Sequence, residues 1–403
     1  MPAELSLTQV RRAALHCQLL DGRARLGRGL GALDRLVEQL GYIQIDTISV
    51  VERAHHHTAW ARLPAARAGW LERLLEARRV FEYWGHAASY LPSSDYRFYL
   101  PAMRRYRENP HAWAAEQQRR HKKTIAAVRE RIRQDGPLTA QDFETPDGSR
   151  GPWWDWKPAK AALEVLFWQG ELMIAGRRGF QRVYDLTERV LPPGTDTTMP
   201  SRDEWARFLV TRALNAYGVA REYDIRFHIK ADQHLVNEGI RAMLADGTVV
   251  EVAVEGEGRM KYYALADRLD GLASLRAVNP RLHILSPFDN LVIQRDRMRR
   301  LFGFDYTIEC YTPPEKRRYG YFSLPLVWGE RFAGRLDAKA ERAAGVLNVR
   351  GMWLEDSFVP DVAFVHAVGD RLKQFAGFNG CNAIRITCRK PASLISNLKQ
   401  LVS

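Results

Sequence analysis

Apolar positions near the start of the chain recur at the spacing of a helix. One such run begins after Ser6 and Thr8, and a second covers about residues 30–40 and ends at Gly41. A polar residue before an apolar run and a glycine after one are typical helix boundaries. The next residues, 42–51, are rich in β-branched side chains and predict a strand. The N-terminal region is therefore expected to form two helices and a strand.

A polar stretch follows this strand and is expected to be a loop or a hairpin tip. It spans residues 52–57 and contains three consecutive histidines. Further on, the pattern predicts a helix over about residues 66–78 and an aromatic strand over 81–84. Residues 104–133 then hold ten Lys or Arg against three Glu. We interpret this segment as a helical connection with a positive face.

Two later segments repeat one order of elements. Each predicts helices followed by a two-stranded hairpin, with helices at about 124–134, 157–169, 202–217 and 232–244 and hairpins at about 171–185 and 248–265. This order is typical of a winged helix-turn-helix unit, which places one helix and the hairpin against a duplex. Arg177 and Arg178 fall in the turn of the first hairpin, where they would reach DNA. Winged helices also dock proteins, and that alternative stays open.

The pattern changes beyond residue 280, where short strand-like runs dominate. They lie at about residues 291–294, 306–311, 318–327, 332–337 and 346–354. A helix over about 360–375 follows, and together these elements predict a small antiparallel barrel. The fold class expected for the whole chain is α+β, with three tandem winged helices and a C-terminal antiparallel β-barrel. The expected domains are 1–118, 119–198, 199–278 and 279–403.

Charge and cysteine content narrow the class of partner. Sixty Lys and Arg stand against 47 Asp and Glu, a formal charge of +13. Such an excess favours a polyanionic partner, although a merely solubilising surface would give the same count. The four cysteines form no CxxC pair, and we see neither a signal peptide nor an apolar run of roughly 18 residues. We expect a reduced, cytoplasmic protein with no membrane span.

Gln44 and Asp46 are the first candidates for catalysis. In a strand, residues i and i+2 project from the same face, so the two side chains would lie together. A carboxylate can accept a proton or stabilise a developing cation, while an amide orients a water molecule. A Gln-x-Asp pair on a solvated strand face would look the same in the sequence.

The run His55, His56 and His57 suggests a metal site, but consecutive residues cannot all converge on one ion, and no metal is expected. With Trp60 and Arg62 close behind, the run better suits contact with phosphates and bases of DNA. A solvated loop is the plain alternative. Three tryptophans at positions 153, 154 and 156 are interpreted as core or domain-interface aromatics.

Four longer strings resemble those of the YcaQ-like, or AlkZ/AlkX-like, DNA glycosylases. They are GYIQIDTISVVERAHHH (41–57), YWGHAASYLP (83–92), LSPFDNL (285–291) and YTPPEKRRYGY (311–321). The resemblance implies three tandem winged helices and a β-barrel around a positively charged channel for duplex DNA. It also implies excision of N7-alkylguanine and unhooking of interstrand crosslinks. The catalytic motif of one branch is Gln-hydrophobic-Asp, which places Gln44 and Asp46 at the active site. Ala87 stands where such proteins often have Glu.

Such a site needs little equipment, because N7-alkylated guanine is already cationic and leaves as a neutral base. Asp46 and Gln44 would stabilise an oxocarbenium-like sugar and direct water at C1′. No lysine adjoins the motif, so a monofunctional enzyme without cofactor is expected, acting as a monomer on double-stranded DNA with alkylated or crosslinked guanine. The main rival is a winged-helix DNA-binding regulator without catalytic activity, and a protein-docking scaffold is another. A regulator has no need of a carboxylate on a surface that faces phosphates.

Overall fold

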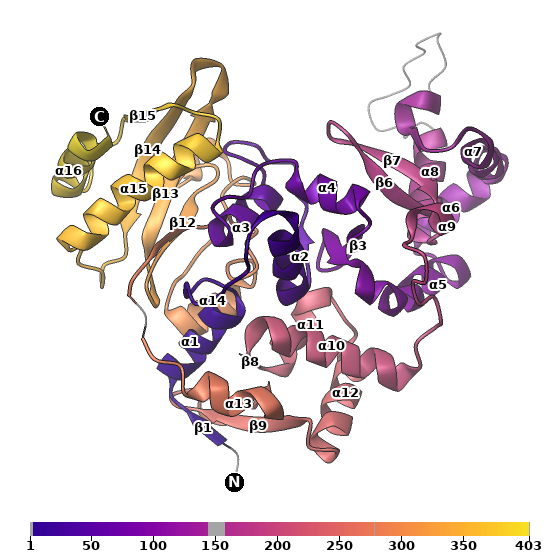
Figure 1. The fold of residues 1–403 in the computed structure, drawn as a ribbon, viewed down its shortest axis with the longest axis horizontal. Helices are drawn as coiled ribbons and strands as arrows, with labels where there is room; N and C mark the ends of the chain where they lie inside the picture. The colour runs from indigo at the N-terminus through magenta and orange to yellow at the C-terminus, as the bar shows by residue number, and fades with distance from the viewer. Residues whose placement is uncertain (1–2, 144–157, 278, 403) are drawn as a thin grey trace. The chain divides into compact units, whose positions relative to one another are not determined.

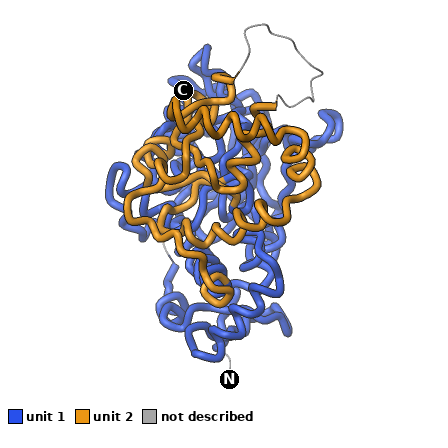
Figure 2. Tube along the Cα trace, turned by 90° about the vertical axis from the view of Figure 1, so that its right-hand side faces the viewer, with its two compact units in different colours: residues 1–70, 85–88, 206–403 blue, residues 71–84, 89–205 orange. Residues whose placement is uncertain are grey.

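A computed structural model describes residues 3–143, 158–277 and 279–402. The three tryptophans at 153, 154 and 156 lie outside the described residues. The chain divides into two compact units, coloured in Figure 2: unit 1 comprises residues 1–70, 85–88 and 206–403, and unit 2 comprises residues 71–84 and 89–205. The four smaller domains expected from the sequence stay a prediction. No helix within the described residues is long and apolar enough to cross a membrane.

Both predicted N-terminal helices are confirmed in unit 1. Helix α1 spans Leu7–Cys17, and Ser6 caps it in a reciprocal pair with Gln9. Helix α2 spans Gly29–Leu40 and ends at Gly41, whose φ of +78° is the left-handed conformation that glycine favours. A Cβ atom at position 41 would also lie 2.7 Å from His228 Nε2, so glycine is required there for space as well.

The segment after α2 differs from its prediction. Strand β2 comprises only Ile43–Gln44, and residues 45–53 have no regular structure. The β-branched side chains beyond β2 do not build a strand because they pack elsewhere: Val51 is buried in the core beneath the C-terminal sheet. The predicted loop at 52–57 is also wrong. Helix α3 spans Ala54–Arg62, and all nine of its residues are buried.

The third helical segment of unit 1 follows the predicted order. Its elements are α10 (Arg202–Tyr217), β8 (Val219–Ala220), α11 (Glu222–Ile229), α12 (Gln233–Ala245), β9 (Val249–Val254), β10 (Tyr262–Leu265) and α13 (Ala266–Ala273). The hairpin strands β9 and β10 pair antiparallel, and β8 lies beside β10. Strand β1 (Ala3–Leu5) adds to the other edge, parallel to β9.

The C-terminal part of unit 1 is a five-stranded sheet in the order β11-β12-β13-β14-β15. Its strands are Leu282–Ile284, Leu324–Trp328, Arg331–Glu341, Val346–Leu354 and Ala383–Ile386. The α+β class is confirmed, and the predicted antiparallel barrel is present only in part, as a half-barrel sheet: the described edge strands β11 and β15 do not pair with each other, and β15 runs parallel to β14. Helix α15 (Val362–Phe378) packs on the sheet, with α16 (Ala392–Val402) beside it (Figure 1).

Two predicted strands in this region do not form. Residues 291–294 make turns that lead into helix α14 (Arg295–Phe302), and residues 306–311 are irregular. Their apolar side chains are nevertheless buried: Leu291, Val292 and Tyr306 belong to a separate small core. Apolar content alone could not distinguish a strand from a buried irregular segment.

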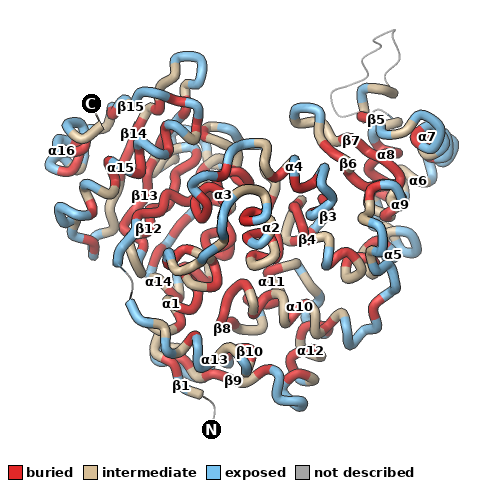
Figure 3. Tube along the Cα trace, viewed as in Figure 1, coloured by how far each residue is buried: buried red, intermediate tan, exposed pale blue. Residues whose placement is uncertain are grey.

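Unit 2 is mainly helical and basic. It contains α4 (Trp70–Glu76, from its second residue), β3 (Val80–Trp84), most of β4 (Ala88–Pro92), two 3₁₀ turns (Ser93–Tyr99 and Ala140–Phe143), α5 (Leu100–Glu108), α6 (Ala112–Arg120), α7 (Lys122–Asp135), β5 (Leu138–Thr139), α8 (Pro158–Trp168), β6 (Leu172–Arg178), β7 (Gln181–Leu186) and α9 (Thr187–Val190). Strands β5, β7 and β6 form a sheet in that order. Helix α7 buries only Ile125, Val128 and Ile132, and the rest of it is largely exposed (Figure 3).

Candidate active site

The segment that carries the candidate catalytic pair is fixed by backbone contacts within unit 1. Asn290 Nδ2 donates to the carbonyl oxygen of Tyr42 at 2.9 Å. Ile45 N donates to the carbonyl oxygen of Ala88 at 2.8 Å. The ring of Tyr42 packs edge-on against the buried His228, with centroids 5.0 Å apart. These contacts hold β2 from both ends and set the direction of the side chains between them.

Gln44 is polar, yet its side chain is almost enclosed. The residue is 8% exposed, and its Oε1 atom is buried with no hydrogen-bond partner among the described residues. Buried polar atoms in proteins nearly always have a partner, so an orphaned acceptor is a feature that asks for an explanation. A carbonyl oxygen in this position can accept a hydrogen bond from a water molecule or a substrate.

Asp46 lies just beyond the end of β2, so the argument that it shares a strand face with Gln44 is wrong. Its Oδ1 atom accepts a hydrogen bond from Ile48 N at 2.7 Å, the turn in which an Asp side chain binds the backbone two residues on. The carboxyl group is half-buried. Burial raises the pKa of Asp46 above its usual value, and hydrogen bonds from the backbone of Ile48 and Thr47 offset only part of that rise.

Two residues far away in the sequence lie within electrostatic reach of Asp46. Burial raises the pKa of Cys310, and the negative charge of Asp46 raises it further. Cys310, together with burial and Asp46, also raises the pKa of the neighbouring Tyr311. Spacing could not reveal this proximity, because more than 260 residues separate the two segments. The signal in the sequence was the string YTPPEKRRYGY, which begins at Tyr311.

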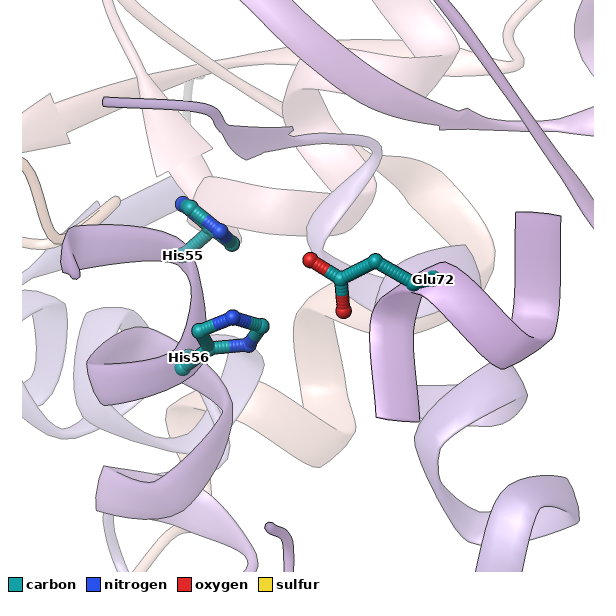
Figure 4. A group of neighbouring side chains, drawn as sticks. All are labelled: His55, His56 and Glu72. Carbon is teal, nitrogen blue, oxygen red and sulfur yellow. The ribbon is translucent and has the colours of Figure 1, made fainter. Parts of the chain in front are cut away.

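The histidine run lies on α3 and divides into two parts. The rings of His55 and His56 lie next to each other, with centroids 4.2 Å apart (Figure 4). The third side chain in that figure, Glu72, comes from α4 in unit 2. His57 packs instead against Phe375 of α15, and its Nε2 atom lies 2.9 Å from the carbonyl oxygen of Ile284. Burial lowers the pKa of His57 to about 4, which keeps the ring neutral at physiological pH.

Trp60 and Arg62 are part of the interior of unit 1. Trp60 is 2% exposed and stacks on Phe378, with the Arg371 guanidinium over its ring. Arg62 donates to both carboxylate oxygens of Asp289, at 2.6 and 2.9 Å, and both side chains are fully enclosed. The burial of α3 gives these residues a packing role, and their contact with DNA stays a prediction.

Asp289 thus has its partner in a segment that is distant in the sequence. Arg297, which lies only eight residues downstream, pairs instead with the buried Asp224 of α11 at 3.2 Å. The string LSPFDNL therefore has a positioning function: Asp289 holds α3 through Arg62, and Asn290 holds β2 through Tyr42.

The hairpin of unit 2 separates the two arginines assigned to its tip. Strand β6 continues through Arg178, so the turn lies at Gly179–Phe180 rather than at 176–179. Arg177 is enclosed and donates to Glu82 at 2.6 Å. The side chain of Arg178 is 64% exposed and lies 3.8 Å from Asp142. Of the two, only Arg178 has the exposure that a phosphate contact needs.

Comparison with known proteins agrees with this arrangement. The model of the AlkZ-like DNA glycosylase family matches residues 37–378. The fold is similar to that of the solved Streptomyces sahachiroi DNA glycosylase AlkZ, with a TM-score of 0.64 at 19% sequence identity, covering 96% of this chain and 100% of that one. The family match contains Gln44, Asp46 and the strings that position them. The chain therefore belongs to the AlkZ-like DNA glycosylase family and is a DNA glycosylase that acts in DNA repair.

Proposed function

We propose that this enzyme hydrolyses the N-glycosidic bond of N7-alkylguanine and unhooks interstrand crosslinks built on that lesion. The observation that carries the proposal is the pairing of a nearly enclosed amide, which has an orphaned acceptor, with a half-buried carboxylate two residues later. Such a site can direct water and stabilise positive charge. The roles assigned to these two residues include no protonation of the leaving base, so the pair suits a base that leaves unaided.

The chemistry of the lesion requires no more than this amide and this carboxylate. Alkylation at N7 makes guanine cationic, and breaking its bond to C1′ releases a neutral base without a general acid. The sugar becomes an oxocarbenium-like cation, as it does in glycoside hydrolysis. The Asp46 carboxylate stabilises that cation and accepts a proton from the attacking water. Oε1 of Gln44 accepts a hydrogen bond from the same water and so fixes its direction.

The surrounding fold suits duplex DNA as the substrate. In the sheets that contain β5 to β7 and β8 to β10, the first strand lies beside the third, and helices precede each hairpin. We infer that these segments and the N-terminal one are three winged helices, and that the enzyme acts as a monomer in the cytoplasm. Arg178, at the exposed tip of one hairpin, is the proposed phosphate contact in unit 2.

The direct test is base release from a duplex with a single N7-methylguanine, and strand separation of a nitrogen-mustard crosslinked duplex. Asp46→Asn should lower both rates about 10²- to 10⁴-fold, the usual contribution of one acid–base group. Asp356→Asn, which changes an exposed aspartate on a surface turn, is the matched control. Undiminished release by Asp46→Asn would refute the assigned role, and no release by the unaltered enzyme would refute the proposed lesion.

The pH profile gives an independent readout of the same role. The rate should fall as Asp46 becomes protonated, and burial raises its pKa above the usual 3.8. The acid limb of the profile should therefore lie at a higher pH than an ordinary aspartate would give. A rate that stays constant down to pH 4 would mean that another group carries the reaction.

A further inference from the structure

Among the described residues, Tyr311 is the most exposed of the large aromatic side chains. It is 85% exposed, and of the large apolar side chains described only Val359 and Val362 are also more than half exposed. Single exposed apolar residues are common on protein surfaces, so exposure alone assigns no role. The position and the support of this ring are what distinguish it.

Tyr311 lies within electrostatic reach of the proposed catalytic carboxylate. Ile48, two residues after Asp46, and Ile308, three residues before Tyr311, pack on the same core beneath the C-terminal sheet. Val50 O accepts a hydrogen bond from Ala340 N of β13, which ties the Asp46 segment to that sheet. The charge of Asp46 acts on both Cys310 and Tyr311. All of these residues belong to unit 1.

The loop that carries Tyr311 is well supported at its base. The Glu309 carboxylate accepts hydrogen bonds from Arg318 N at 2.9 Å and Tyr319 N at 2.7 Å. Thr312 N donates to the carbonyl oxygen of Glu309 at 3.0 Å. Tyr319 packs between Arg335, 4.1 Å from its ring centroid, and Trp353. The loop therefore holds the half-buried Tyr319 through these contacts and leaves Tyr311 exposed.

The charge of the loop fits a nucleic acid. Lys316, Arg317 and Arg318 are consecutive and basic, and they outnumber the two acidic residues of the loop, the exposed Glu315 and Glu309, which is engaged with the backbone. Arg317 stacks over Tyr321 with its Nε atom donating to Thr312 O at 2.8 Å, so this guanidinium is also held in place. Basic side chains that flank an exposed aromatic ring are the combination that proteins use to bind phosphates and stack bases.

We propose that Tyr311 stacks on a base of the duplex at the lesion, beside the sugar at which Asp46 acts. The proposal rests on the proposed function for the identity of the lesion. Stacking on a base face is tolerant of sequence, which suits an enzyme whose lesions occur in any sequence context. The ring would hold the base next to the damaged nucleotide and so define the position of C1′ relative to Asp46 and Gln44.

The test measures binding without chemistry. The probe is a duplex with a tetrahydrofuran abasic site, which has no glycosidic bond to hydrolyse, and 2-aminopurine as the neighbouring base. Tyr311→Ala should weaken binding roughly ten- to a hundredfold and, at saturating protein, remove most of the change in 2-aminopurine fluorescence. Tyr311→Phe and Tyr311→Trp should retain both signals, because the ring and not the hydroxyl group acts.

Val359→Ala is the control, since this side chain is as exposed as that of Tyr311 but lies outside both the basic loop and the proposed winged helices. It should bind the probe like the unaltered enzyme. Equal affinity and an equal fluorescence change for Tyr311→Ala would overturn the proposal, and so would a Tyr311→Phe variant that behaves like Tyr311→Ala. Because the probe cannot be cleaved, these outcomes do not depend on whether N7-alkylguanine is the lesion, which base release tests separately.

Discussion

Two polar segments of unit 1 lie close together in the sequence but differ in how their side chains are satisfied. At Gln44 and Asp46, one acceptor has no described partner and one carboxyl group is half-buried with a raised pKa. At Arg62, the guanidinium meets both oxygens of Asp289 and the carbonyl oxygen of Gln18. A polar group with a complete set of partners stabilises the fold. A polar group with an incomplete set of partners can still form a hydrogen bond with a substrate or a water molecule.

The largest expected effect is a loss of stability when the enclosed ion pair is broken. Arg62→Met removes one half of a fully enclosed ion pair and leaves the Asp289 charge buried, so the free energy of unfolding should fall by about 3–5 kcal/mol. Urea denaturation measures it. The double variant Arg62→Met with Asp289→Leu should recover much of the loss, since neither charge remains. A single variant as stable as the parent would show that the pair is not structural.

The second effect is the pH dependence of stability from His57. Its pKa is lowered to about 4 in the folded chain, against an ordinary 6.5, so the unfolded chain takes up the proton first as pH falls. The stabilisation is complete above pH 6.5 and is lost as pH falls through 4, a loss of about 3 kcal/mol. His57→Gln should flatten the dependence over that range in urea titrations. An unchanged slope would mean that the ring is already charged in the folded protein.

A smaller effect is expected at Gln44, and it concerns rate rather than stability. Gln44→Ala removes the group that directs the water but leaves the carboxylate, so base release should fall about ten- to a hundredfold. Gln44→Glu is an informative companion, because it keeps the acceptor while adding a charge next to Asp46. If Gln44→Ala keeps full activity while its thermal midpoint drops, Gln44 belongs with Arg62 among the structural groups.

The smallest effect has the opposite sign. Because burial raises the pKa of Asp46, the protonated form is favoured in the folded state, and this stabilisation is lost as pH rises through the folded pKa. At pH 7 the charge is therefore a slight cost, and Asp46→Asn should have a thermal midpoint equal to or slightly above that of the parent. At pH 3 the difference should vanish. A clear drop at pH 7 would assign Asp46 a structural role.

The sequence predicted helices and hairpins better than it predicted the site. Helices α1, α2, α10 and α12 and both hairpins follow local signals, namely caps, glycine stops and amphipathic spacing. The C-terminal sheet was harder to predict from the sequence. Strand β15 follows α15 and pairs in parallel with β14, a contact between residues that are distant in the sequence. Whether a sheet closes into a barrel depends on whether its two edge strands pair, and no local sequence pattern indicates that pairing.

The site illustrates the same limit. The argument that placed Gln44 and Asp46 on one strand face is wrong, since Asp46 lies outside the strand, and their joint role stays a prediction. The histidine run was expected to be exposed because its residues are polar. The desolvation cost of burying an imidazole is small when the ring is neutral and packs against other rings, as His57 does against Phe375. Tyr311 could be connected to Asp46 only by the folded chain.

The brief return of the chain to unit 1 at residues 85–88 bears on how such enzymes can be modified. Residues 71–205 resemble an insertion that could be exchanged as a cassette. Yet the Ala88 carbonyl, within that stretch, accepts the hydrogen bond from Ile45 that positions the catalytic segment. A chimaera that replaces 71–205 whole would lose this support, whereas one that exchanges only residues 93–198 would keep it. The useful points of recombination are therefore set by four residues rather than by the apparent borders of the units.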